Sequence, residues 1–162
     1  MIVIRPSALA DAEWVGEHLR DADAQEVQTA TGANPLVAVL RAFAISSECF
    51  SIFRSERGRV MGTPCALFGV VPDLGNAGYG VVWLLATDDI RGAGISLLRV
   101  ADRWLDYLSR SYPKGLHNYA DQRNTLHIRW CKLSGFTLGA LHDIGGFPFQ
   151  YIHRPSGAPQ LV

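Results

Sequence analysis

The segment from Tyr79 to Ala120 constrains the fold more than any other part of the sequence. It begins with an apolar run over 81–87, which predicts a buried strand. A loop of small residues follows over 91–96, and a second strand is expected over 116–120. Between them, apolar residues recur at helical spacing: Leu98, Ala101, Trp104, Leu105 and Leu108. Because a long helix between two strands acts as a crossover, the strands at 81–87 and 116–120 are expected to pair in parallel.

The residues after the second strand predict a short helix with a defined start and end. Asn124 can cap a helix that begins at Thr125, and Gly135 suits the position at which that helix stops. Phe136 is then expected to return the chain to the core. His127 and Cys131 are four residues apart and therefore share one face of this helix.

The rest of the sequence adds strands and helices on both sides of this segment. Further strands are expected over 2–6, 49–54, 64–71, 137–142 and 147–152. Helices are expected over 7–19 and 35–47, and turns at 55–58, 75–78 and 145–146. Residues 21–34 are polar and ambiguous. The order of elements predicts an α+β fold with a mixed sheet, in a single domain over 1–154 with a loose tail over 155–162.

Charge and cysteine content exclude several classes of protein. The 162 residues carry 15 Lys and Arg against 15 Asp and Glu, so no overall field draws the protein to nucleic acid or to an anionic membrane. No run approaches the length of a membrane span, and the first apolar run is too short for a signal peptide. The three cysteines form no metal-like pair, and the histidines have no metal-ligand spacing, so we expect a cytoplasmic protein without metal.

The loop over 91–96 has the composition of a phosphate-binding turn. Small residues between a buried strand and a helix leave amide N–H groups pointing outward at the positive end of the helix, where a pyrophosphate can lie. Arg91, Gly94 and Ser96 have a spacing that suits this ligand. The same glycines would also serve a tight strand-to-helix connection without any ligand.

Taken together, the strand, the 91–95 loop, the long helix, the next strand, Asn124 and Gly135-Phe136 resemble the GNAT (Gcn5-related N-acetyltransferase) superfamily over most of the chain. The resemblance implies an α/β/α arrangement, in which helices cover both faces of a mostly antiparallel sheet with one splayed parallel strand pair. It also implies that acetyl-CoA or CoA binds as co-substrate. The cofactor-binding residues implied are Leu84, Leu85, Ala86, Thr87, Arg91, Gly92, Ala93, Gly94, Ile95, Ser96 and Asn124.

A closer resemblance covers about the C-terminal half. The chain is similar here to the small GNAT-like virion-morphogenesis protein of T7-like phages, at Asn118-Tyr119, Asn124-Thr125, His127 to Arg129, Lys132, Gly135 and Gly146 to Gln150. This resemblance implies two alternatives. One is a phage-type N-acetyltransferase that acts on an unknown amine, and the other is a catalytically degenerate assembly factor that binds virion proteins. The host cytoplasm or the virion is the implied location.

The departures from the GNAT pattern concern catalysis. Cys131 falls where the family's tyrosine acid would lie, and the strand over 79–87 contains no carboxylate to deprotonate an amine. Asp121 or His117 is the expected base, acting through water, although a solvated turn carboxylate is the simpler interpretation of Asp121. The expected chemistry is direct attack of the amine on the thioester, which needs no covalent intermediate, although His127 and Cys131 also permit a thiol nucleophile with a histidine base.

Overall fold

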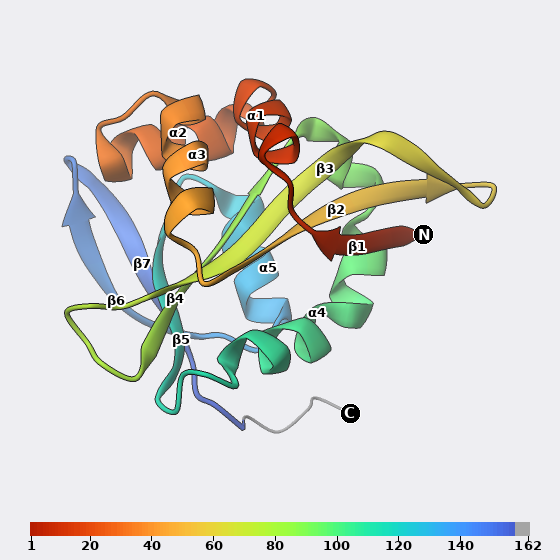
Figure 1. Cartoon of the computed structure of the whole chain (residues 1–162). Coiled ribbons are helices and arrows are strands. Elements are labelled where there is room, and N and C mark those ends of the chain that lie inside the picture. The colour runs from red at the N-terminus through yellow and green to blue at the C-terminus, as the bar shows by residue number, and fades with distance from the viewer. Residues whose placement is uncertain (158–162) are drawn as a thin grey trace.

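A seven-stranded sheet with helices on both faces forms the body of the molecule (Figure 1). The computed structural model describes residues 1–157. The strand order is β1-β2-β3-β4-β5-β7-β6, and every neighbouring pair is antiparallel except β4 and β5. The strands are β1 (Ile2–Pro6), β2 (Glu48–Glu56), β3 (Arg59–Pro72), β4 (Tyr79–Ala86), β5 (Gly115–Asp121), β6 (Thr137–Ile144) and β7 (Phe147–Arg154). The predicted mixed, mostly antiparallel sheet with one parallel pair is confirmed.

Helices pack on the two faces of the sheet because neighbouring strand residues point to opposite faces. The helices are α1 (Leu9–Glu17), α2 (Asp21–Thr31), α3 (Pro35–Ile45), the 3₁₀ turn η1 (Asp88–Gly92), α4 (Gly94–Ser109) and α5 (Thr125–Leu133). Leu67 of β3 packs with α1 and α3, whereas its neighbour Phe68 packs with α4. Ala120 of β5 and Ile152 of β7 pack against α5 through Cys131.

Most element boundaries agree with the sequence to within a few residues, and two elements, the 3₁₀ turn η1 and helix α2, were not predicted. The ambiguous segment 21–34 contains α2, an eleven-residue helix that ends at Gly32 in the left-handed region (φ 68°). The predicted cap of α5 is confirmed, since the Asn124 side chain accepts from the His127 N–H. Gly135 follows α5 with φ +81°, as expected for a helix stop.

The start of the predicted loose tail is fixed by hydrogen bonds. The Ser156 hydroxyl lies within hydrogen-bonding distance of the Ser109 and Tyr112 carbonyl oxygens, which terminate α4 and the turn after it. The remainder of the tail, residues 158–162, lies outside the described residues.

Candidate functional site

The parallel strands β4 and β5 pair only at their beginnings and then separate. Three positions are paired: Tyr79 with Gly115, Gly80 with Leu116 and Val81 with His117. Beyond them β4 stays with β3 as far as Ala86, while β5 stays with β7. At the point of separation, the Asn118 side chain donates to the Val82 carbonyl at 2.8 Å. The sheet therefore opens into a wedge whose two walls end in unpaired strand edges.

The backbone groups of β4 that face this wedge are those of alternate residues. The Thr87 N–H donates to Cys65 of β3, so Leu85 also faces β3, and Leu84 and Ala86 face the wedge. The Ala86 N–H is occupied by the Asp23 carboxylate at 2.9 Å. Of the amides from Leu84 to Thr87 proposed to hold a thioester, only that of Leu84 faces the wedge without a hydrogen-bonding partner among the described residues.

The loop between β4 and α4 leaves free donors at the start of a long helix. The Leu97 N–H is the first to bond within the helix, to Ala93, so the amides of Gly94, Ile95 and Ser96 have no helical partner. A side chain at position 94 would project toward Trp130, since a Cβ atom built there would lie 3.4 Å from that ring. The start of α4 therefore presents free N–H donors that can bind an anion.

The other loop residues either shape the turn before α4 or lie exposed beside the start of this helix. Ala93 is buried. Gly92 lies against the Arg54 guanidinium, since a Cβ atom placed on Gly92 would be only 2.9 Å from Arg54 Cζ. The Arg91 side chain is exposed and pairs with Asp88 at 3.4 Å. Gly92 and Ala93 therefore shape the turn, and Arg91 keeps its charge at the surface beside the helix start.

Two adjoining cavities follow the wedge. The larger, about 450 Å³, runs past the start of α4 and along α5. Its lining includes Arg20, Asp23, Arg91, Gly94, Ile95, Leu98, Leu126, Arg129 and Leu133. The smaller, about 100 Å³, is apolar, lies between α4, α5 and the sheet, and includes Asn118 and Cys131 in its wall. Leu84, His127 and Trp130 line both cavities, so the larger groove leads to the smaller cavity at the free Leu84 amide.

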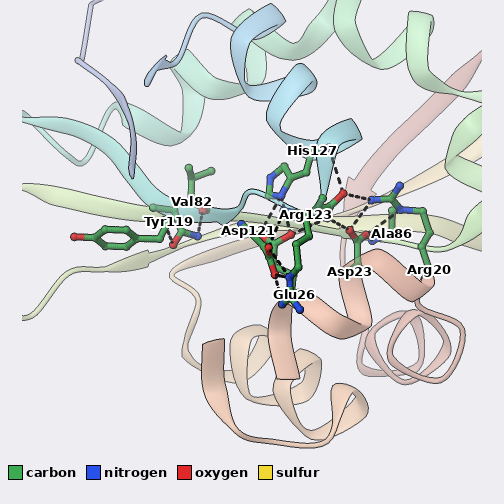
Figure 2. Close-up of polar contacts among 11 residues, drawn as sticks. Arg20, Asp23, Glu26, Val82, Ala86, Tyr119, Asp121, Arg123 and His127 are labelled. Atoms are coloured by element: carbon green, nitrogen blue, oxygen red, sulfur yellow. Dashed lines mark hydrogen bonds and ion pairs between the residues drawn. The ribbon is translucent and has the colours of Figure 1, made fainter. Parts of the chain in front are cut away.

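Carboxylates from α2 close the other side of the wedge (Figure 2). Asp23 forms a two-point ion pair with Arg20, with its shortest N–O distance 2.6 Å, and also accepts from Ala86. One turn along α2, Glu26 accepts from the Asp121 N–H at 3.1 Å. The two carboxylates thus join the ends of β4 and β5, which no longer pair with each other.

Asn124 connects these carboxylates to the start of α5. Its amide nitrogen donates to Asp23 at 2.8 Å and to Glu26 at 2.7 Å, while its oxygen caps α5. Asn124 is 2% exposed, so it is a structural link and presents no free group to the larger groove.

His127 is held by Glu26 as an ion pair. Its Nδ1 lies 3.1 Å and 3.2 Å from the two Glu26 oxygens. Burial opposes charge on the ring, but Glu26 and Cys131 outweigh it, so the pKa of His127 lies well above its usual value. Burial likewise opposes charge on Glu26, and the His127 charge together with hydrogen bonds from His127, Asn124 and Asp121 lowers its pKa.

Asp121 lies next to this network but has another partner. It is 1% exposed, so the expected solvated carboxylate is wrong. Its oxygens accept from the Arg123 guanidinium at 2.6–3.1 Å, and Arg123 in turn stacks on Phe147. Burial raises the pKa of Asp121, but the Arg123 hydrogen bonds and charge lower it below its usual value. Asp121 lines neither of the two cavities.

His117 and Cys131 lie on opposite faces of the sheet, because α5 packs on the face to which Ala120 of β5 points, and His117 points to the other face. The His117 ring lies between Asp73 at 2.8 Å and the Tyr151 hydroxyl at 3.0 Å, outside both cavities. Cys131 is 5% exposed and lines the smaller cavity beside His127. The structure therefore brings Cys131 together with Leu84 in the wall of the smaller cavity, and separates His117 and Asp121 from them.

Sequence reasoning missed Arg20, Asp23 and Glu26, the residues that complete the network. Asp23 and Glu26 are three apart and share one face of α2, which is a detectable signal only once the segment is known to be helical. Arg20, the residue before the helix, is 7% exposed although its side chain is charged. A buried ionic face leaves no apolar pattern.

The mixed seven-stranded sheet with its one parallel pair matches the fold of solved GNAT-family acetyltransferases. A GNAT-family acetyltransferase from Streptococcus pneumoniae superposes with TM-score 0.65 and 14% identity, covering 97% of this chain and all of that one. YncA from Salmonella typhimurium, with its cofactor acetyl-CoA, gives 0.65, 12% identity and coverage of 99% and 96%. Aminoglycoside acetyltransferase AAC(6')-Ib, with coenzyme A and kanamycin, gives 0.63, 15% identity and coverage of 96% and 95%.

Sequence comparison identifies no further related protein. No protein-family model and no curated protein matches the chain. Over residues 1–157, no helix has both the length and the apolar character needed to cross a membrane. In the same part of the chain, no three His, Cys, Asp or Glu side chains are grouped so that they could hold a metal ion.

Proposed function

We propose that the protein is an acyl-CoA-dependent N-acyltransferase that transfers an acetyl group from acetyl-CoA to an amine. One observation carries the proposal: a continuous groove runs from the free amides at the start of α4 to the unpaired Leu84 amide in the wedge between β4 and β5. Solved neighbours with this fold contain acetyl-CoA or CoA. The location that we propose is the cytoplasm, that of the bacterial host if the protein is phage-encoded, with the virion as the alternative.

The residues along the groove match the parts of acetyl-CoA in order. The amides of Gly94, Ile95 and Ser96 would take the pyrophosphate, with Arg91 and Arg129 as nearby positive charges. Apolar side chains would cover the pantetheine arm: Leu98, Leu126, Trp130 and Leu133. The Leu84 N–H would donate to the thioester oxygen and stabilise the charge that develops on it during attack.

The groups around the thioester position can also supply a proton. His127 lies in the wall shared by the two cavities and is held protonated by Glu26. An imidazolium there would protonate the departing CoA thiolate, the role that a tyrosine has in the GNAT pattern. Asp121, ion-paired and outside both cavities, would keep Arg123 and the turn before α5 in place.

Calorimetric titration with CoA tests the cofactor groove. Exchanging Gly94 for Glu places a charged side chain between the α4 start and Trp130, where it would repel the phosphates, so binding should weaken at least about tenfold, or about 1.4 kcal/mol. The matched control is Gly62→Glu, because a side chain at Gly62 meets open space on β3. Equal affinity in both variants would contradict the role of the α4 start.

The alternative that we propose is a GNAT-fold assembly factor that binds virion proteins. The observation that favours it is the closure of the wedge by Asp23 and Glu26, which occupy the strand ends on the α2 side. A folded protein that gives no heat with CoA or acetyl-CoA, and that co-purifies with virion proteins from infected cells, would favour this alternative over the enzyme.

A further inference from the structure

The smaller cavity begins at the position assigned above to the thioester. It meets the larger groove at Leu84, His127 and Trp130, which line both. The Leu84 N–H is the free donor proposed to hold the thioester oxygen. An acyl group held by this N–H can therefore extend its alkyl end away from the groove and into the smaller cavity.

The walls of the smaller cavity are largely apolar. Apolar cavities in protein cores stay dry and bind small apolar molecules, so the lining indicates an apolar occupant. The sheet and α4 supply most of the apolar side chains: Phe68, Ile152, Leu97, Ala101, Trp104 and Leu108.

Two polar side chains in the wall already have partners. The Asn118 amide nitrogen donates to the Val82 carbonyl at 2.8 Å, and its oxygen accepts from the Tyr119 N–H at 2.8 Å. His127 is the one charged side chain in the described lining, and it is paired with Glu26. A carboxylate at the end of an acyl chain would lose its hydration here and meet no free positive charge. The lining therefore favours an alkyl chain over a dicarboxylic acyl group.

The volume of the smaller cavity limits the length of this chain. The cavity measures about 100 Å³. A water molecule occupies about 30 Å³ in the liquid, and a methylene group is about as large, so roughly three or four carbon atoms fit. An acetyl group places only its methyl carbon there, which leaves most of the wall without the dispersion contacts that a longer chain would supply.

We propose that the preferred donor is a CoA thioester with a saturated acyl chain of about four or five carbon atoms, whose alkyl end lies in the smaller cavity. This inference rests on the proposed N-acyltransferase function and names its acyl group. It adds no chemical step, because the amine attacks the same carbonyl carbon whatever the length of the chain.

Calorimetric titration with a series of CoA thioesters tests the donor without an acceptor amine. The probes are CoA, acetyl-CoA, butanoyl-CoA, pentanoyl-CoA and octanoyl-CoA, and the measured quantity is the dissociation constant (Kd). Each methylene group moved from water into the cavity should lower the Kd about fourfold, so butanoyl-CoA should bind about 15-fold more tightly than acetyl-CoA. Octanoyl-CoA exceeds the cavity and should bind no more tightly than pentanoyl-CoA.

A variant that fills the cavity provides the second measurement. Ala101 lines the smaller cavity but not the larger groove, and a leucine side chain there would occupy the space of the alkyl chain. In Ala101→Leu, the ratio of the acetyl-CoA Kd to the butanoyl-CoA Kd should fall from about 15 to about 1. The matched control is Ala10→Leu, at an exposed position on α1, which should keep the wild-type ratio. If Ala101→Leu does not fold, the series with the wild-type protein decides alone.

The outcomes separate this inference from the proposed function. Equal Kd values for CoA, acetyl-CoA and butanoyl-CoA would overturn the acyl-chain assignment and leave the groove standing. An affinity that keeps rising through octanoyl-CoA, or an unchanged ratio in Ala101→Leu, would show that the chain binds outside the cavity and would also overturn it. No heat with any of the five probes, from a folded sample, would contradict the proposed function itself.

Discussion

His127 combines a buried position with a charge that its neighbours maintain. Its side chain is 20% exposed, and its partner Glu26 is 10% exposed. A buried ion pair gains little stability over an apolar pair of the same shape, because both charges lose their hydration. We infer that this pair persists for the position and protonation that it gives to the His127 ring at the wall of both cavities.

This ion pair predicts how stability depends on pH. The folded pKa of His127 is raised above the unfolded value near 6.5, so its contribution is complete below about pH 6.5 and is lost as the pH rises through the folded pKa. The folded pKa of Glu26 is lowered, so its contribution is complete above the unfolded value of about 4.5 and is lost as the pH falls through the lower folded pKa.

Urea unfolding across this range measures the effect. Above about pH 6.5, the free energy of unfolding of wild type should fall more steeply with pH than that of His127→Gln, which has no proton to lose. His18→Gln is the control, since that histidine is surface-exposed and contacts only its own helix. Parallel pH profiles for wild type and His127→Gln would contradict a protonated His127 in the folded protein.

The sequence predicts some of these residues and cannot predict others. Asn124, His127 and Cys131 follow from local patterns, because a cap and an i,i+4 pair are set by neighbours in the chain. Glu26 and His127 are 101 positions apart, and only the tertiary fold brings them together. For Asp121 the local pattern is misleading. Its place at the end of a strand indicates a solvated turn, whereas the residue is buried, its carboxylate paired with Arg123 and its N–H bonded to Glu26.

Helix α2 is the element that links the N-terminal half to the site. Its buried residues are Asp23 and Glu26, and Val27 is its one large apolar side chain packed on the core, so hydrophobic periodicity gives no clear signal for it. By contrast, α4 and α3 bury apolar residues at regular spacing and are predicted to within a few residues. The position of α2 therefore depends on its charged partners in other elements, which only the complete fold supplies.

This dependence predicts a large effect from a single change in α2. Asp23→Ala removes the partner of the buried Arg20 and leaves the Ala86 N–H without an acceptor, so it should reduce the free energy of unfolding by about 3–5 kcal/mol. Asp21→Ala, on the same helix with an exposed side chain, should change it by less than about 1 kcal/mol. Chemical denaturation of both variants measures the difference, and similar losses would show that the Asp23 contacts do not anchor α2.

At the scale of the whole molecule, the order of elements determines where the wedge forms. A single crossover helix makes β4 and β5 the one parallel pair in the sheet, and pairing over three positions leaves their ends apart. The order of strands and helices is readable from hydrophobic patterns, which is why the fold could be predicted. The closure of the wedge by α2 could not, because it depends on how helices from both ends of the chain meet across the sheet.

Ligand binding at this wedge should raise the Tm of the protein and slow amide hydrogen exchange mainly in the elements that line the groove. A ligand at 100 times its Kd adds about 2.7 kcal/mol, which raises the Tm of a chain of this length by about 5–10 °C. With CoA, amide hydrogen exchange should slow in β4, in the first turns of α4 and in α5, which line the groove, and stay unchanged in α3, which packs on the opposite face. Gly94→Glu should lose both effects at the same CoA concentration, while Gly62→Glu should keep them. Uniform protection that includes α3 would instead indicate general tightening of the fold, and would remove the assignment of CoA to the groove.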